Sequence, residues 1–124
     1  MGTDKVSIPS DNESSNQRLE GQIHDILEAI AATESFVSGI DFLEFSRDQK
    51  TIFAVERALG IIAATAKRLP IFFVDQYPQI NWRQLTSLGD SLTFGYLDVD
   101  LNTLWELTQK DIPFLKELMK QSIK

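Results

Sequence analysis

Apolar residues recur at helical spacing through most of this chain and predict helices rather than strands. Between residues 17–37 and again between 49–69 they follow one another at steps of three, four or seven, which places them on one face of a helix. The first stripe consists of Leu19, Ile23, Ile26, Leu27, Ile30 and Val37, and the second of Ile52, Val55, Leu59, Ile62 and Ala66. No segment alternates apolar and polar residues long enough to indicate a strand. The pattern predicts an all-α protein, an up-and-down bundle of four or five helices.

Residues with special backbone preferences mark the ends of these helices. Gly39 suits a left-handed residue after the first helix. Either Ser46 or Asp48 is expected to cap the second helix, and Pro70 to end it. Asn81 is a candidate cap for a third helix over about 82–94. A short connection around Pro78 follows, and it carries several aromatic and aliphatic residues, namely Phe72, Phe73, Val74, Tyr77 and Ile80.

The last helix is expected to start after Asp100 and to meet a proline. Pro113 lies inside its apolar pattern, lacks the backbone N–H, and should kink the helix or restart it with Asp111 as a local cap. The inward positions are Leu101, Leu104, Trp105, Leu107, Phe114, Leu115, Leu118 and Met119. A kinked last helix is therefore predicted.

The chain divides into a polar tail and one domain. Residues 1–16 are rich in Ser, Asp and Asn, and they bury too little apolar surface to offset their ordering entropy, so we expect a disordered tail. Residues 17–124 are predicted to form a single helical domain, in keeping with a length of 124 residues. The second helix is slim because it carries five alanines, and with the surplus of aromatic residues this favours further burial in a homodimer.

The net charge of the chain indicates which kinds of partner it can bind. The formal net charge is −6, which argues against broad nucleic-acid binding through phosphates. A small basic pocket remains compatible with it, and Lys67, Arg68 and Arg83 are its candidate residues. Lysine and arginine at a helix C-terminus also complement the helix dipole, which is the ordinary alternative.

Missing residue types exclude several kinds of chemistry. The chain has no cysteine, which removes disulfides and thiolate chemistry and fits a reducing compartment. No apolar run approaches the roughly 18 residues of a membrane span, and residues 1–16 lack the order of a signal peptide. We therefore expect a cytoplasmic protein that does not bind membranes. Phosphate-binding glycine loops and the nucleophile-elbow pattern are also absent, so no cofactor is predicted.

Histidine and acidic residues give only weak site signals. His24 is the single histidine, at the edge of the first apolar stripe. It is either a general base or metal ligand, or an ordinary boundary residue, and the second interpretation is favoured because no partner cluster surrounds it. Asp98 and Asp100 have the spacing of calcium-loop ligands, but the remaining pattern is missing. Helix capping by Asp100 is favoured, and no metal site is predicted.

Several blocks of the sequence resemble one known family. They are RLEGQIHDILEAI (18–30), FVSGIDFLEF (36–45), AVERALGIIAATAKRLP (54–70), YPQINWRQL (77–85) and GYLDVDLNTLWELTQKDIPFLKEL (95–118). Their order and spacing are similar to the HepT-like branch of the HEPN superfamily, from about residue 18 to 122. The resemblance implies a helical bundle that forms homodimers. It also implies a metal-independent ribonuclease toxin paired with a small nucleotidyltransferase antitoxin.

The family's active site is an Arg followed after four to six residues by His, with Asn after the Arg and Tyr two positions after the His. In such a motif the histidine moves a proton and the arginine holds the phosphate. The resemblance places Gly89, Asp90, Phe94 and Tyr96 at these four positions. Neither Gly89 nor Phe94 can perform the chemistry, so no catalytic residue of the motif is intact. In a helix, Gly89 should also cost about 1 kcal/mol relative to alanine.

Two further positions separate this chain from its typical relatives, which carry acidic residues near Gly60 and Ala64. Tyr96 is retained. In some relatives this tyrosine receives a nucleotide from the antitoxin, whereas here it is either such a site or simply a packed aromatic residue. His24 has no arginine partner in its own segment and is a poor replacement for the missing histidine.

Three functions follow. The first is a catalytically degenerate HepT-like protein that acts by dimerisation and by binding a partner or ligand. The alternative is an active, metal-independent RNase toxin with a divergent site, neutralised by a nucleotidyltransferase antitoxin, in which case RNA is a partner. The third is a helical structural or regulatory module outside any toxin system.

Overall fold

The computed structural model describes residues 11–94 and 99–123, and every regular element in these ranges is helical. The prediction of an all-α protein is confirmed. The elements are α1 (Asp11–Val37), α2 (Phe42–Ser46), α3 (Gln49–Lys67), α4 (Ile71–Asp75), α5 (Trp82–Phe94), α6 (Leu101–Glu106), the π-helical turn η1 (Leu107–Asp111) and α7 (Ile112–Ser122). Helix α1 begins six residues before the predicted start at residue 17. The one-turn helices α2 and α4 lie in segments that the sequence pattern treated as connections.

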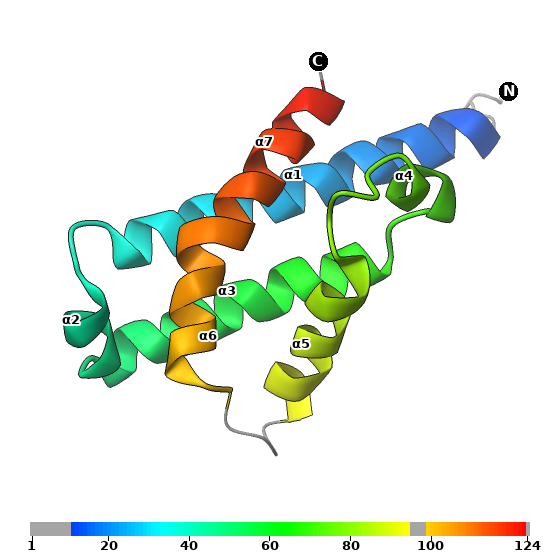
Figure 1. The fold of residues 1–124 in the computed structure, drawn as a ribbon. Helices are drawn as coiled ribbons and strands as arrows, with labels where there is room; N and C mark the ends of the chain where they lie inside the picture. Colours follow the sequence, from blue (N-terminus) through cyan, green and yellow to red (C-terminus); the bar gives the residue numbers. More distant parts are fainter. Residues whose placement is uncertain (1–10, 95–98, 124) are drawn as a thin grey trace, which may run out of the picture.

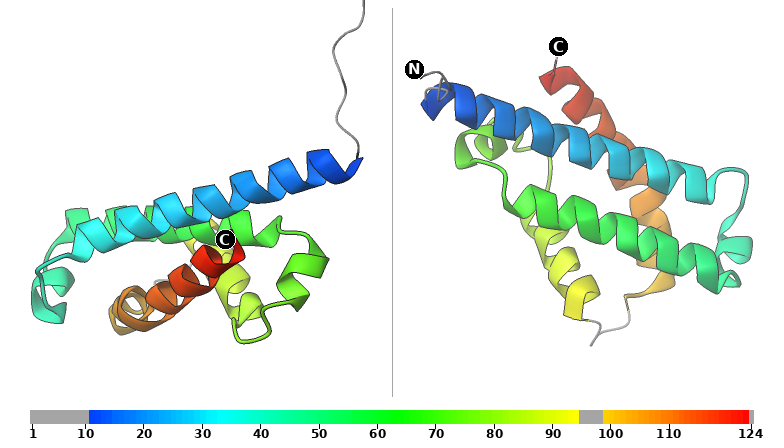
Figure 2. Two further views of the ribbon diagram at one scale, coloured as in Figure 1. Left: turned by 90° about the horizontal axis from the view of Figure 1, so that it is seen from above. Right: turned by 180° about the vertical axis from the view of Figure 1, so that it is seen from behind.

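The long helices α1 and α3 run antiparallel and side by side, joined through α2 (Figures 1 and 2). Helix α5 packs on α3. The elements α6, η1 and α7 follow one another as a single rod that crosses the α1–α3 pair, and α7 contacts α1. Helix α3 is therefore the central element, with α1 on one side and α5 on another.

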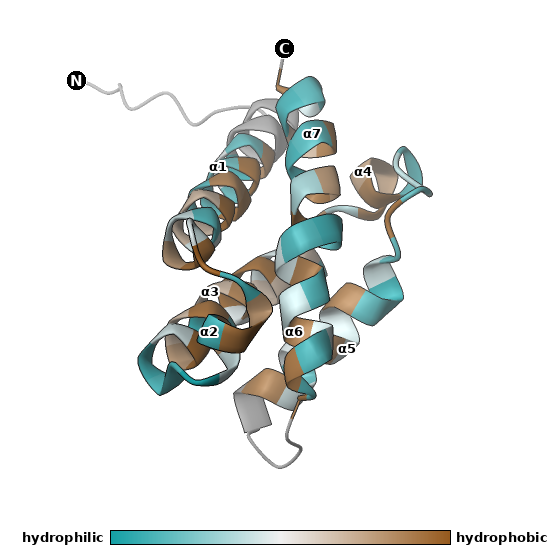
Figure 3. Cartoon of the chain, turned by 60° about the vertical axis from the view of Figure 1, so that its left-hand side comes forward, coloured by the Kyte–Doolittle hydropathy of each residue, from teal (hydrophilic) through white to brown (hydrophobic). Residues whose placement is uncertain are grey.

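The core is built from the predicted apolar stripes. Helices α1 and α3 bury Ile26, Ile30, Leu59 and Ile62, each with no more than 1% of its surface exposed. Figure 3 shows the helices banded in brown and teal, as expected for amphipathic helices that turn one face to the core. Leu104, Ile112 and Met119 complete the core from the α6–η1–α7 rod.

Most of the predicted helix boundaries are confirmed. Gly39 has a φ of 79° after α1, a left-handed conformation that other residues rarely adopt. Asp48 caps α3 by accepting a 3.2 Å hydrogen bond from the Thr51 N–H, and Ser46 instead ends α2. The hydroxyl of Thr51 also donates to the Asp48 carboxylate and lowers its pKa below the ordinary value. Asn81 caps α5 through a 3.0 Å bond from the Gln84 N–H.

The expected restart at Asp111 is wrong. Asp111 has helical dihedral angles, φ −67° and ψ −43°, and its side chain makes no capping hydrogen bond. The helix instead widens, and the Ile112 N–H bonds to the Leu107 carbonyl, five residues back. The wide turn is a physical answer to Pro113, whose ring would press on the carbonyl four residues earlier and whose nitrogen has no proton to donate.

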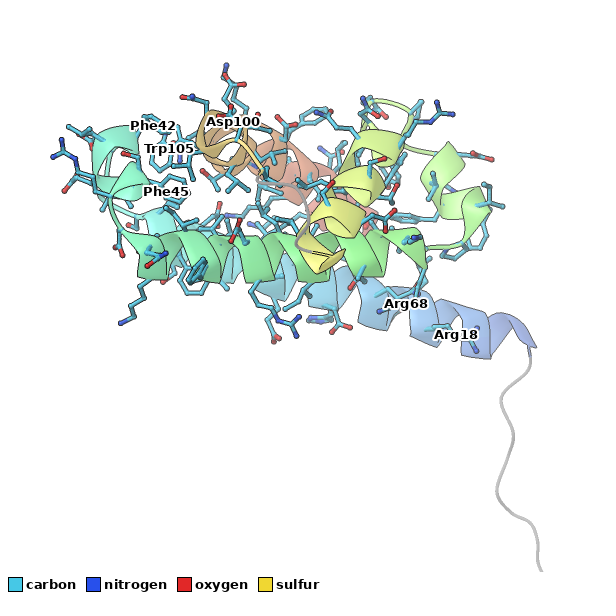
Figure 4. The ribbon with its side chains drawn as sticks, turned by 90° about the horizontal axis from the view of Figure 1, so that it is seen from below. Arg18, Phe42, Phe45, Arg68, Asp100 and Trp105 are labelled. Atoms are coloured by element: carbon cyan, nitrogen blue, oxygen red, sulfur yellow. The ribbon has the colours of Figure 1, made fainter. Side chains whose placement is uncertain are left out.

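An aromatic cluster joins α2 to α6. The ring centres of Phe45 and Trp105 are 5.2 Å apart, and Phe42 meets Trp105 edge-on at 6.2 Å (Figure 4). Phe45 is fully buried. Asp100 takes the N-cap position of α6, but the predicted capping by its side chain is wrong, because the carboxylate accepts no bond from a backbone N–H of the helix. It accepts instead a 3.4 Å bond from the Thr103 hydroxyl.

Replacement of Phe45 by alanine should lower the free energy of unfolding by about 3–5 kcal/mol, because it removes a fully buried ring and leaves a cavity. The matched control is Phe53→Ala in α3, whose side chain is 59% exposed and should cost less than about 1 kcal/mol. Urea unfolding followed by circular dichroism measures both. Equal losses for the two variants would show that the α2–α6 cluster does not stabilise the fold.

Candidate functional site

The segment in which the resemblance places the nuclease motif begins at Gly89, in the second half of α5, and runs past the end of this helix. Gly89 and Asp90 lie in the middle of α5, on the side that packs against α3. Phe94 is the last residue of α5. Tyr96 and Asp98 lie outside the described residues, so the candidate modification site at Tyr96 stays a prediction.

Gly89 is buried at the closest approach between α3 and α5. A Cβ atom built on Gly89 would lie 2.5 Å from the Cβ of Ala63, a separation that real Cβ atoms essentially never show. Glycine is less favourable than alanine for helix formation, but this loss of stability is offset here, because any larger residue forces the two helices apart. The small side chain at position 89 is required by packing, and the slim α3 allows α5 to come this close.

Beside this contact lies a hollow of about 240 Å³ that contains two of the three candidate anion-binding residues. It is lined by Ala63, Ala64, Lys67, Arg68, Thr86, Gly89 and Asp90. Arg83 is exposed and does not line it. The Lys67 ammonium lies 3.2 Å from the Asp90 carboxylate, and both side chains are more than half exposed. The Asp90 carboxylate is therefore already paired with the Lys67 ammonium, the cation that would meet an incoming anion.

Arg68 follows the end of α3 and is labelled in Figure 4. Its guanidinium donates to the Ala64 carbonyl at 3.3 Å, and its backbone carbonyl accepts a 3.0 Å bond from the Gln22 side chain of α1. Arg68 therefore ties α1 to α3. It also forms part of the wall of three neighbouring hollows.

The positions at which relatives carry acidic residues open onto the same face. Gly60 and Ala64 line a second hollow of about 370 Å³, together with Ile61, Arg68 and Leu92. Ala64 and Arg68 are shared with the first hollow. The fold thus gathers Gly60, Ala64, Gly89 and Asp90, which are up to 30 residues apart in sequence, on one α3–α5 surface.

His24 belongs to a different part of the molecule. Its exposed side chain lines a hollow of about 550 Å³ between α1, α4 and the end of α7, with Glu20, Gln76, Tyr77 and Ser122. His24 lines neither hollow on the α3–α5 surface. The structure therefore does not bring the single histidine together with Lys67, Arg68 or the motif positions.

The two hollows of the α3–α5 surface are lined by three cationic side chains, Arg57, Lys67 and Arg68, and by the carboxylates of Glu56 and Asp90. Among their lining residues there is no histidine that could move a proton near neutral pH. Within the described ranges, no group of three or more His, Cys, Asp or Glu side chains could hold a metal ion. Among the helices that the structure describes, none is long and apolar enough to cross a membrane.

The sequence pattern did not identify Ala63 as the residue of α3 on which α5 packs. The run of alanines in residues 54–66 indicated that another helix could approach closely, but it did not show which alanine would face which partner. The tertiary contact with Gly89 assigns that role to Ala63.

An all-α bundle with this surface is the architecture expected of a HEPN-like protein, and comparison with known proteins identifies the family. A family model described as "Ribonuclease HepT-like" matches residues 26–122. The chain belongs to this HepT-like family of the HEPN superfamily. No solved structure matches it.

Curated relatives support the same assignment. The "Probable ribonuclease HepT" of Thermococcus cleftensis is 43% identical over 94 residues, which cover 76% of this chain and 86% of the relative. Two proteins of Methanocaldococcus jannaschii whose names carry the RNase designation are 33% identical over 91 residues and 30% identical over 106 residues. They are covered over 75% and 88% of their lengths, and the matches span 73% and 86% of this chain.

Replacement of Gly89 by alanine should destabilise the protein by about 1–3 kcal/mol, because the new methyl group overlaps Ala63. Adding Ala63→Gly removes the overlap, so the double variant should be more stable than the sum of the two single changes predicts. Chemical denaturation of the four proteins of this cycle measures the coupling.

Gly60→Ala is the matched control, since nothing lies within 4 Å of the Cβ it would add. It should leave stability unchanged or raise it by up to about 1 kcal/mol, through helix propensity alone. A stabilising Gly89→Ala, or strict additivity with Ala63→Gly, would rule out the close approach of α3 and α5.

Proposed function

We propose that this HepT-like protein does not cleave RNA and acts through dimerisation and through binding of a partner or ligand. The observation that carries the proposal is the buried contact of Gly89 with Ala63, at the position where the family motif has its arginine. A residue that serves as the packing surface between two helices cannot reach out to a phosphate.

Asp90 supports the same proposal. It occupies the position after the motif arginine, where Asn is usual in the family, and it forms the ion pair with Lys67. Its negative charge repels a phosphodiester and partly neutralises the nearest cation. With Phe94 at the histidine position, the segment has neither the proton carrier nor the phosphate ligand that RNA cleavage by its own 2′-hydroxyl requires.

The second candidate function is an active, metal-independent RNase toxin with a divergent site, neutralised by a nucleotidyltransferase antitoxin. The names of the relatives, which designate a ribonuclease and several RNases, favour it. In that case Lys67 and Arg68 would hold the phosphate, and Tyr96 would be the target of nucleotide addition by the antitoxin. Such a protein would act on RNA in the cytoplasm.

Purified protein should leave a labelled single-stranded RNA intact, at the level of a buffer blank, because the motif is empty. Restoring the motif with Gly89→Arg, Asp90→Asn and Phe94→His should produce cleavage only when Ala63→Gly is added, since the arginine needs the space of the Ala63 methyl group. Gel analysis of the RNA after incubation in EDTA measures both effects and excludes metal-dependent contaminants.

The alternative makes an opposite prediction for the unmodified protein. Cleavage by wild-type protein that is lost in Lys67→Ala or Arg68→Ala, with the folds of both variants preserved, would establish a divergent active site. Gln121→Ala, an exposed change on α7, is the control that should leave any cleavage unchanged.

Dimerisation is best supported on the face formed by α1 and α3. Phe36 and Ile61 are 40% and 37% exposed there and line a hollow of about 430 Å³. Asp25 and Glu28 of α1 and Arg57 of α3 line the same hollow. A two-fold axis places the same patch of both copies in contact, so a patch that contains both signs of charge around apolar residues can complement itself.

Ile61→Asp should therefore convert a dimer to a monomer by burying a carboxylate in the apolar part of this face. Ile71→Asp is the matched control, because Ile71 is 75% exposed on α4 and does not line this hollow. Sedimentation at micromolar concentration measures the mass. A wild-type monomer, or a dimer that survives Ile61→Asp and is lost in Ile71→Asp, would contradict this interface.

A further inference from the structure

A hollow of about 350 Å³ lies at the start of α5, between this helix and the η1–α7 segment, and none of the motif positions that the structure describes lines it. Its volume falls in the range of small-molecule sites. Two of the blocks that carry the family resemblance border it, one around Ile80 and Asn81 and the other around Asp111 and Leu115. The π-helical turn η1 forms one wall, and such turns frequently mark functional sites. We call it the α5–η1 pocket.

The floor of the α5–η1 pocket is apolar and its rim carries side-chain amides. The floor consists of Ile80, Leu85, Leu107, Ile112 and Leu115, and the aromatic ring of Phe114, 48% exposed, stands beside it. Gln79, Asn81 and Gln84 contribute the three amides. The Asn81 oxygen is used in capping α5, which leaves its NH₂ group to donate. Across the described part of the chain, no hydrogen bond engages the side-chain amides of Gln79 and Gln84.

The charged groups of the α5–η1 pocket stand at its edge. The Lys110 ammonium lies 3.6 Å from the Glu106 carboxylate in an exposed ion pair, so its charge is already partly compensated. The Asp111 side chain makes no capping hydrogen bond, because its backbone is helical and the chain continues from η1 into α7. Its carboxylate remains an acceptor on the rim. This edge favours hydroxyl groups over phosphates.

We propose that the α5–η1 pocket binds the adenine base of a nucleoside. A Gln or Asn amide presents a donor and an acceptor side by side and matches the N6 and N7 atoms of adenine. Phe114 supplies a face on which the flat base stacks, and the aliphatic floor covers the ring. The Asp111 carboxylate accepts hydrogen bonds from the ribose hydroxyls, as an acidic residue does in other nucleoside sites.

The same base could come from a free nucleoside or from an unpaired adenine of RNA. The net charge of −6 and the Asp111 carboxylate at the mouth disfavour a polyanion, so the free nucleoside is the expected ligand. This inference does not depend on whether the protein cleaves RNA, because Gly89, Lys67 and Arg68 take no part in the α5–η1 pocket.

The test is a titration of the isotope-labelled full chain with adenosine, followed by NMR of the side-chain amide signals. The signals of Gln79, Asn81 and Gln84 should shift in a saturable way, and uridine at the same concentrations should shift them far less. Gln84→Met keeps the length of the side chain and removes the amide, so it should weaken adenosine binding by about tenfold or more. Gln121→Met, an exposed change on α7, is the matched control and should bind like wild type.

A parallel titration with a short oligoadenylate separates the two sources of the base. Saturable shifts of the same amide signals with either probe support the adenine site, and the tighter probe identifies the source. Absence of saturable shifts with both probes overturns the proposal. Equal binding by wild type and Gln84→Met, with the Gln84→Met fold confirmed by circular dichroism, overturns it as well. Either failure would leave the RNA-cleavage result unaffected.

Discussion

The close approach of α3 and α5 is the constraint on which the arrangement of this domain depends. Helix α3 lies between α1 and α5 and contacts both. Ala63 and Gly89 set the distance on the α5 side. Arg68 ties the end of α3 to α1 through the bond from Gln22. The position of α5 in turn determines which side chains at positions 89 and 90 can reach solvent. It also leaves the α5–η1 pocket open beside the η1–α7 rod.

This packing gives a structural role to two residues of the segment to which the resemblance assigns the family motif. Gly89 takes part in the α3–α5 contact by its lack of a side chain, and Asp90 forms an ion pair with Lys67. The exposed ion pair itself adds little stability, because solvent screens both charges. The overlap at Gly89 is a steric constraint that solvent does not weaken. A larger side chain at position 89, an arginine included, is therefore incompatible with the observed distance between α3 and α5.

The short and irregular elements could not be predicted from the spacing of apolar residues. One-turn helices such as α2 and α4 contain too few residues to establish a helical period, so their apolar residues were expected in connections. The end of the protein shows a second limit. Pro113 correctly indicated a disturbance, but a proline can be accommodated by a kink, a restart or a wide turn. Only the structure shows that a wide turn forms, through the hydrogen bond from the Ile112 N–H to the Leu107 carbonyl.

The sequence alone determined the all-α class, the family, the main core residues and the cap at Asn81, because these depend on spacing and on local hydrogen bonds. It left Ser46 and Asp48 as alternatives for the cap of α3, and it predicted the segment in which the motif should lie. Only the tertiary structure decided that Gly89 faces Ala63, that Lys67 meets Asp90, and that His24 lies elsewhere. Those outcomes depend on how far apart and at what rotation two helices pack. That geometry is set jointly by side chains on different helices and is not encoded in the spacing within any one of them.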